Sequence, residues 1–265
     1  MNQVAFAIVA HPDDIEFRIA GTLRLLQQAG WEIHCMNIAS GSLGSIEYSA
    51  AETRRVRRTE AQAAAKILGA HWHPSLVDDI EIGYDLKTLK RLTAVIREVK
   101  PGILFTHPPQ DYMEDHTNAC RLAVSAAFAR GIPNLRTVPS RAAYDGDVTL
   151  YHCLPHGMCD QLCRPMIPQC YVNIASVMET KRAALNAHQS QVTWLQATQG
   201  MDAFTRFMEA DALTAGRRSQ KFKYAEGFWK HLHLGYCGET ANPLQAALGK
   251  NYLVNPKWER LMRDA

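Results

Sequence analysis

Residues 4–14 of the chain read VAFAIVAHPDD. The seven apolar residues Val4–Ala10 predict a strand buried on both faces, as in the middle of a parallel sheet. Pro12 has no N–H for a strand ladder and favours extended geometry at His11, so the strand is expected to end here. Apolar residues at helical spacing follow in Ile15–Ala29. The acids of the turn are therefore expected at the carboxyl edge of the sheet, where open α/β sheets bind ligands.

The two adjacent acids of this turn, Asp13 and Asp14, have two interpretations. In the first, one of them caps the helix that follows, which is a common position for Asp. In the second, His11 and Asp14 bind a borderline divalent metal ion, and Asp13 acts as a base beside it. The first interpretation needs a single acid and leaves His11 without a role. The spacing alone does not decide between them.

The rest of the chain alternates between apolar runs and helical patterns, which predicts an α/β fold with a mostly parallel sheet. No glycine fingerprint follows the first strand, which disfavours a nucleotide-binding protein. Further strands are expected at Ile33–Ala39, His73–Val77, Ile103–Thr106 and Gln169–Ser176, and helices at Ala50–Leu68, Leu86–Val99, Val177–Thr198 and Met201–Leu213.

Length and composition limit the class of protein. The 265 residues are expected to form one domain, with residues 229–265 as a C-terminal extension. The 29 basic and 26 acidic residues give a net charge of +3, which implies no nucleic-acid or membrane partner. There is no basic segment with a signal core at the start, no apolar run of membrane length, and no paired spacing among the seven cysteines. We therefore expect a cytoplasmic protein.

A second group of acids and histidines follows the predicted strand Ile103–Thr106. Residues 107–116 read HPPQDYMEDH, and a helical pattern comes next. Because the carboxyl ends of parallel strands meet at one edge of a sheet, His116 is expected near His11 and Asp14. Two histidines and one carboxylate are the ligand count of an open catalytic zinc site.

These motifs carry a resemblance to a known family. The AHPDD turn of residues 10–14, the Asp-Tyr-x-x-Asp-His pattern of residues 111–116 and the Arg-x-x-Glu pattern of residues 57–60 occur in order. The segments AHQSQ at 187–191 and YAEGF at 224–228 agree with them. Together they resemble the PIG-L/LmbE family of zinc-dependent N-deacetylases acting on N-acetylglucosaminyl compounds.

The resemblance implies a Rossmann-like three-layer fold and one zinc ion per chain, although another divalent metal also suits these ligands. His11, Asp14 and His116 would be the metal ligands and Asp13 the general base. The expected substrate is a small molecule with an N-acylated amino sugar, from which water releases a carboxylate and a free amine. Relatives of this kind often form homo-oligomers, trimers or hexamers.

The chain departs from the family pattern at Met113, where many members have a histidine that steadies the oxyanion or acts as an acid. A thioether donates neither a hydrogen bond nor a proton. Asp115, which normally orients that histidine, is retained and is assigned a catalytic role, as is His188 of the AHQSQ segment. His152 and His156 are the other candidates for the missing donor. The alternative is a metal-retaining ligand-binding homologue with weak or lost catalysis.

Three further alternatives stay open. Arg57 is either a substrate contact or part of a solvated basic face, which is the usual fate of a charge run. The substrate is either an amino sugar or a different small amide. Cys153, Cys159, Cys163 and Cys170 lie within 18 residues and either form a structural zinc knuckle or pack as single small apolar residues.

Overall fold

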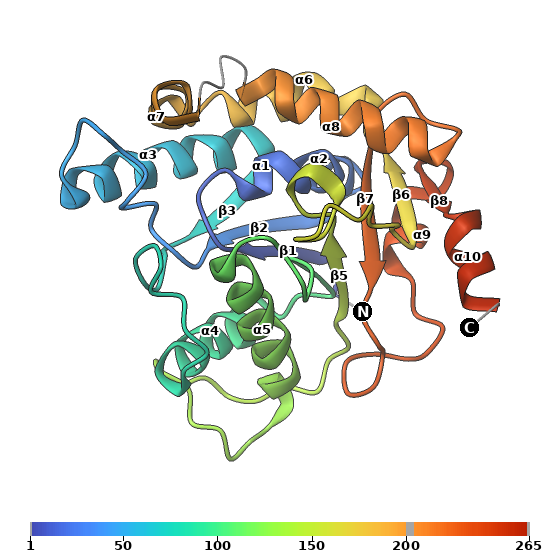
Figure 1. Cartoon of the computed structure of the whole chain (residues 1–265). Helices are drawn as coiled ribbons and strands as arrows, with labels where there is room; N and C mark the ends of the chain where they lie inside the picture. Colours follow the sequence, from blue (N-terminus) through green and yellow to red (C-terminus); the bar gives the residue numbers. More distant parts are fainter. Residues whose placement is uncertain (1, 200–203, 264–265) are drawn as a thin grey trace.

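One eight-stranded sheet runs through the protein (Figure 1). The computed structural model describes residues 2–199 and 204–263. The strand order is β3-β2-β1-β4-β5-β7-β6-β8, in which β3 to β5 pair in parallel and the remaining pairs are antiparallel. This confirms the predicted α/β class and the mostly parallel sheet. The strands are β1 Val4–Val9, β2 Glu32–Asn37, β3 Ala70–His73, β4 Ile103–Thr106, β5 Thr149–Cys153, β6 Cys170–Asn173, β7 Ala225–Lys230 and β8 Tyr252–Val254.

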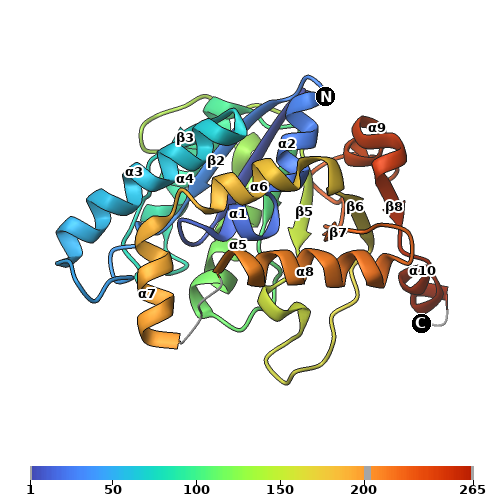
Figure 2. The ribbon, with the colours of Figure 1, turned by 90° about the horizontal axis from the view of Figure 1, so that it is seen from above.

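Helices cover both faces of the sheet, which gives three layers (Figures 1 and 2). α1, α2, α3, α6 and α8 lie on one face, and α4 and α5 lie on the other. Within the described residues, no helix is long and apolar enough to cross a membrane. The α-helices are α1 Asp14–Arg18, α2 Ala20–Gln28, α3 Ala50–Leu68, α4 Leu86–Val99, α5 Glu114–Phe128, α6 Met178–Leu185, α7 Gln189–Gln199, α8 Phe204–Ser219, α9 Pro243–Leu248 and α10 Pro256–Arg263, and the short 3-10 helices are η1 Ala129–Gly131, η2 His156–Met158, η3 Ala175–Val177 and η4 Gly249–Asn251.

Strand β1 is buried on both faces, as its continuous apolar run predicts. Ala5, Ala7 and Val9 belong to the core between the sheet and the α1–α2 layer. Phe6 and Ile8, which point the opposite way, belong to the core beneath α4 and α5. The strand is therefore fixed from both sides, and its carboxyl end presents the following turn in a defined position.

Two helices have the bounds predicted from sequence, because their own residues mark their ends. Ser49 and Glu52 form a capping box at the start of α3, and Gly69, with φ 73°, ends that helix. Asp85 caps α4 by accepting a hydrogen bond from the N–H of Thr88 at 2.8 Å.

The single helix predicted for Ile15–Ala29 is wrong, because the chain forms α1 and α2 with a break at Ile19. The first N–H groups of α2 need acceptors at that break. Glu226 on β7 supplies them, accepting from the N–H of Gly21 at 2.9 Å and of Thr22 at 2.8 Å. Helical periodicity in the sequence cannot reveal a cap that comes from so distant a residue.

The long helix predicted for Val177–Thr198 is interrupted in the same way, into α6 and α7. Ser190, in the first turn of α7, donates its N–H and its hydroxyl to the two carboxylate oxygens of Glu60 on α3, each at 2.7 Å. Once more a distant acid caps a helix that the sequence pattern joins to its neighbour.

Other predicted elements differ at their bounds. The strand expected at His73–Val77 is wrong: β3 comes earlier, and its residues 70–73 read AHWH, which lacks a buried apolar run because β3 is an edge strand. The start of the helix predicted at Met201–Leu213 lies outside the described residues. Residues 229–265, expected as an extension, contribute β8 to the same sheet.

Candidate metal centre and catalytic side chains

The turn after β1 holds Asp13 in an unusual backbone conformation. Its φ is 104°, a left-handed region that costs a non-glycine residue about 1–3 kcal/mol. Arg57 on α3 holds the turn by donating from Nη2 to the Asp13 carboxylate at 2.9 Å and to the carbonyl of Pro12. Such strain persists only where neighbours enforce it, and it is typical of functional sites. The carboxylate of Asp13 is thereby held separately from that of Asp14.

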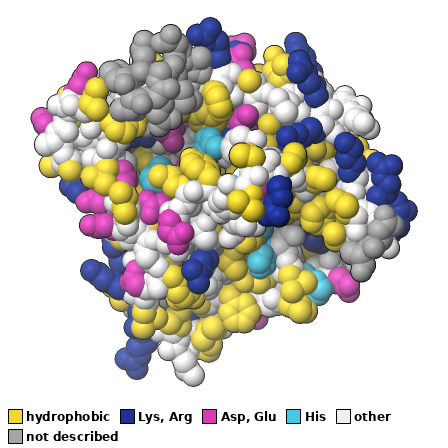
Figure 3. Space-filling view, in the orientation of Figure 1, with side chains coloured by type: hydrophobic (Ala, Val, Ile, Leu, Met, Phe, Trp, Pro, Cys, Tyr) yellow, Lys and Arg dark blue, Asp and Glu magenta, His cyan; other side chains and the backbone are white. Residues whose placement is uncertain are grey.

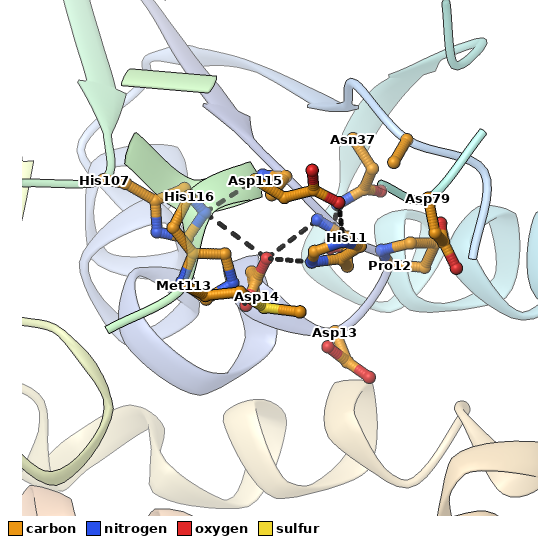
Figure 4. A network of polar contacts seen from close by, with 12 residues as sticks. His11, Pro12, Asp13, Asp14, Asn37, Asp79, His107, Met113, Asp115 and His116 are labelled. Carbon is orange, nitrogen blue, oxygen red and sulfur yellow. Dashed lines mark hydrogen bonds and ion pairs between the residues drawn. The ribbon is translucent and has the colours of Figure 1, made fainter. Parts of the chain in front are cut away.

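His11, Asp14 and His116 come together at the carboxyl ends of β1 and β4 (Figure 4). One ligand atom from each lies within 4.8 Å of the other two. Nδ1 of His11 is 3.6 Å from Oδ2 of Asp14, and Nε2 of His116 is 3.5 Å from Oδ1 of the same carboxylate. The structure thus brings together the three residues that the sequence analysis assigned as metal ligands.

Each of the two histidines is oriented by a carboxylate on its outer side. Nε2 of His11 lies 3.0 Å from Oδ2 of Asp115, and Nδ1 of His116 lies 3.0 Å from Oδ1 of Asp111. Because each outer nitrogen donates to a carboxylate, the inner nitrogens face Asp14, which is the arrangement found around metal-binding histidines. The sequence pattern instead predicts Asp115 as the partner of a histidine at the position of Met113, and it does not predict the role of Asp111.

The electrostatics of this group favour a cation at its centre. Burial lowers the pKa of His11, but its hydrogen bonds with Asp115 and Asp14 outweigh burial and raise that pKa to about 10. Burial raises the pKa of Asp14, yet the charges of His116 and His107 hold it well below its usual range. The group therefore stabilises positive charge, and its two imidazoles and one carboxylate suit a divalent ion such as zinc.

His107, at the end of β4, forms one wall of this centre. Its ring stacks on that of His116, with centroids 4.0 Å apart, and its Nε2 accepts a hydrogen bond from the N–H of Ala10 at 3.0 Å. His107, Asp111 and His116 form a second group with metal-ligand distances. Because Ala10 occupies the Nε2 lone pair, we assign His107 to positioning His116. In the sequence, the position of His107 directly after the predicted strand Ile103–Thr106 indicates that it lies at this edge of the sheet.

Asp13 is suited to act as a base. Burial raises the pKa of its carboxyl group, while the charge of Arg57 opposes that shift. A base with a raised pKa takes and returns protons near neutral pH more effectively than an ordinary aspartate. Asp13 is not part of the three-residue group, so its carboxylate stays available beside it.

The structure places Arg57 and His188 behind Asp13. The Arg57 side chain is 2% exposed, and besides Asp13 it contacts Glu60 at 3.2 Å and Nδ1 of His188 at 3.4 Å. His188 is fully buried, and its Nε2 lies 3.3 Å from the Glu16 carboxylate. A substrate contact by Arg57 or a catalytic contact by His188 would require either side chain to leave these partners. In this arrangement Arg57 holds Asp13, and His188 contacts Arg57 rather than Asp13.

The other candidate donors occupy different places. Nε2 of His156, in η2, lies 3.4 Å from Oδ1 of Asp14. His152, on β5, instead donates from Nδ1 to the backbone carbonyl of His107 at 2.7 Å. Met113 directly precedes α5 beside the site and is 37% exposed (Figure 4). Of the two candidate histidines His152 and His156, only His156 therefore contacts Asp14.

Two cavities are lined in part by residues of α3. One of about 380 Å³ is lined by Pro12, Asn37, Ser40, Arg58 and Trp72, and another of about 280 Å³ by residues that include Tyr48, Gln189 and Trp194. Figure 3 shows histidine and acidic side chains reaching the surface close together, left of the middle of this face. The first cavity includes Pro12 of the turn after β1, and its volume lies in the range of small-molecule sites.

Within the part of the chain that the structure describes, the four cysteines of the zinc knuckle alternative do not gather into a candidate metal group. All seven cysteines are free thiols, and no candidate metal group among the described residues contains one. Cys153 on β5 and Cys170 on β6 are buried in the core, whereas Cys163 is exposed. The interpretation of these cysteines as single packed residues therefore holds for the buried pair.

Replacing Asp115 with alanine is expected to weaken metal binding about 10–100-fold, because His11 loses the carboxylate that fixes its ring. Titration of the metal-free protein with zinc, followed by calorimetry, measures this. Asp147→Asn, at an exposed position outside the group of metal ligands, serves as the control. Equal affinities in the Asp115 variant and the wild type would remove Asp115 from this role.

The fold and these side chains define an α/β protein with a candidate mononuclear metal centre at its sheet edge. Residues 6–128 match the family described as PIG-L, GlcNAc-PI de-N-acetylase. The chain is 30% identical over 236 residues to the 4-oxalmesaconate hydratase of Pseudomonas putida, covering 84% of this chain and 87% of that protein. The chain belongs to the PIG-L/LmbE family.

Two deacetylases are also similar. The diacetylchitobiose deacetylase of Thermococcus kodakarensis is 29% identical over 230 residues, covering 83% of this chain and 80% of that protein. The solved structure of the N,N'-diacetylchitobiose deacetylase of Pyrococcus horikoshii has a TM-score of 0.73 at 24% identity, covering 91% of this chain and 88% of that one. The family thus includes enzymes of two reaction types.

Proposed function

We propose that the protein is a zinc-dependent hydrolase that removes an N-acyl group, most simply acetyl, from an amino-sugar-type substrate. The observation that carries this proposal is the carboxylate of Asp13, which follows the turn into the group of His11, Asp14 and His116 without belonging to it and is held by Arg57. A metal ion held by that group would polarise an acyl oxygen and lower the pKa of water toward 7.

The chain's own residues account for the proton transfers. Asp13 takes a proton from the attacking water and returns it to the nitrogen of the leaving amine. The C–N bond of the amide breaks, the carbonyl carbon gains the water oxygen, and the products are a carboxylate and a free amine. Arg57 fixes the position of Asp13 throughout, and Asp115 and Asp111 keep the two histidines in place.

The amino-sugar class rests on the deacetylase relative of Thermococcus kodakarensis, whose name gives diacetylchitobiose as its substrate. The cavity of about 380 Å³ beside Pro12 offers room for one sugar unit with its neighbour. Polar and aromatic walls, including Ser40, Arg58 and Trp72, suit the hydroxyl groups and apolar faces of a sugar ring.

A second candidate is hydration of a carbon–carbon double bond. Two observations favour it: the similar 4-oxalmesaconate hydratase of Pseudomonas putida, and Met113, whose thioether supplies no donor for an oxyanion. In such a reaction the water hydroxyl adds to one carbon and a proton to the other, so no amine leaves. Asp13 would serve as the base for the attacking water.

Two parallel assays on the zinc-loaded protein separate these reactions. We expect equal amounts of acetate and free amine from N,N'-diacetylchitobiose or N-acetylglucosamine. Loss of the double-bond absorbance of 4-oxalmesaconate, without any acetate release, would replace deacetylation by hydration. Release from a non-sugar acetamide alone would make the protein an amidase. Zinc binding without turnover in any assay would mean that the protein is a ligand-binding homologue without catalysis.

The compartment and assembly belong to this proposal as well. All seven cysteines are free, which agrees with a reducing compartment such as the cytoplasm. A homo-oligomer, trimer or hexamer, stays a prediction from the family resemblance, and its measurement is light scattering of the purified protein.

A further inference from the structure

Hydrolysis of an amide places negative charge on the acyl oxygen in its transition state, and enzymes stabilise that oxygen with a hydrogen-bond donor held in place beforehand. The residues around Asp14 differ in their capacity to supply one. His11 and His116 already use their outer nitrogens on Asp115 and Asp111, and their inner nitrogens face Asp14. They are therefore occupied as ligands rather than as donors.

The neighbours on the other sides are no better placed. Nε2 of His107 already has two close partners, because the N–H of Ala10 lies 3.0 Å from it and Oδ2 of Asp14 lies 3.3 Å from it. Met113 has a thioether, which is not a donor. Two further side chains with a donor lie beside the centre: His156, and Tyr112, whose ring centroid is 5.4 Å from that of His116.

His156 has a donor directed at the centre. Its Nε2 lies 3.4 Å from Oδ1 of Asp14, and an ionised carboxylate only accepts hydrogen bonds, so that nitrogen carries the proton. The side chain is 22% exposed, so a ligand in the site can reach it.

The ring of His156 is also held in place. It packs edge-on against Phe17, with centroids 4.7 Å apart, and against Tyr112 at 6.1 Å. The backbone turns sharply after it, because Gly157 has φ 70° and the N–H of Met158 bonds to the carbonyl of Pro155 at 3.1 Å. A donor fixed on both sides requires little reorganisation when charge develops.

We propose that His156 is a catalytic residue that donates its Nε2–H hydrogen bond to the acyl oxygen as that oxygen becomes negative. The inference rests on the proposed deacetylation and supplies the group that Met113 cannot. No proton is transferred in this contact. The proton for the leaving amine still comes from Asp13.

The test compares His156→Phe, which keeps an aromatic ring and removes the donor, with His156→Gln, which keeps an N–H. We expect His156→Phe to lower kcat about 10²–10³-fold with little change in KM, and His156→Gln to lose less. Zinc content is expected to stay at the wild-type level. His71→Gln, at an exposed histidine on β3, is the matched control and is expected to change nothing.

A binding measurement checks the same contact without turnover. Methylphosphonate has tetrahedral geometry and anionic oxygens, so its affinity for the zinc-loaded protein depends on the oxyanion donor. Calorimetry is expected to show weaker methylphosphonate binding in His156→Phe than in His156→Gln or the wild type. Met113→His, three residues before His116 at the start of α5, is expected to restore part of the activity and affinity when added to His156→Phe.

Unchanged kcat and unchanged methylphosphonate affinity in His156→Phe would overturn the inference. A loss confined to Tyr112→Phe would also overturn it and assign the donor to Tyr112. Absence of acetate release by the wild type contradicts the proposed function instead, and in that case the methylphosphonate affinities still decide the role of His156.

Discussion

Replacing Asp13 with asparagine is expected to reduce turnover about 10²–10⁴-fold while the protein keeps its metal. The substitution preserves the size of the side chain and an oxygen for Arg57, but it removes the group that takes the proton from water. Burial raises the pKa of Asp13, which fits that role. Acetate release under single-turnover conditions, together with zinc content by mass spectrometry, measures both properties.

The matched control for this change is Asp145→Asn, an exposed position outside the site. Its turnover and zinc content are expected to equal those of the wild type. Turnover by Asp13→Asn at the wild-type rate would show that another group is the base. Loss of zinc in that variant would instead place Asp13 among the metal ligands.

Replacing Glu226 with glutamine is expected to reduce the free energy of unfolding by about 3–5 kcal/mol. Glu226 accepts a hydrogen bond from Nζ of Lys181 at 2.6 Å, and both side chains are almost fully buried. The substitution leaves the ammonium group of Lys181 buried without its counter-charge and weakens the cap on Gly21 and Thr22. Urea denaturation measures the change.

A double variant separates the ion pair from general disruption. Lys181→Met removes the second charge, so Lys181→Met with Glu226→Gln is expected to be more stable than the sum of the two single changes implies. Strictly additive losses would show that the buried charges do not interact. A single Glu226→Gln variant as stable as the wild type would contradict the assigned role of the pair.

The sequence predicts the location of the site more completely than its details. His11 and Asp14 follow one apolar strand and His116 follows the loop of another, so the ends of parallel strands bring them to one edge. Spacing could not show that Asp115 orients His11, because 104 residues separate the two. His156 was one of several candidates, since its position depends on η2, whose turn no periodic pattern marks.

The helices show the same limit. Caps made by nearby residues, such as Ser49 on α3, are visible in the sequence and gave the correct bounds. Caps made by Glu226 and Glu60 come from distant parts of the chain, and each divides a helix that looks continuous. Both acids belong to motifs that the resemblance had singled out, and the structure explains them by the architecture around the site.

The most direct test of the account is to remove the metal with a chelator, add zinc in steps and record acetate release from N,N'-diacetylchitobiose at each step. The account predicts no release without metal and a linear rise that levels off at about one zinc per chain, the capacity of a site of two histidines and one carboxylate. Acetate release that is unaffected by removal of the metal, or no release from the fully loaded protein, would contradict it.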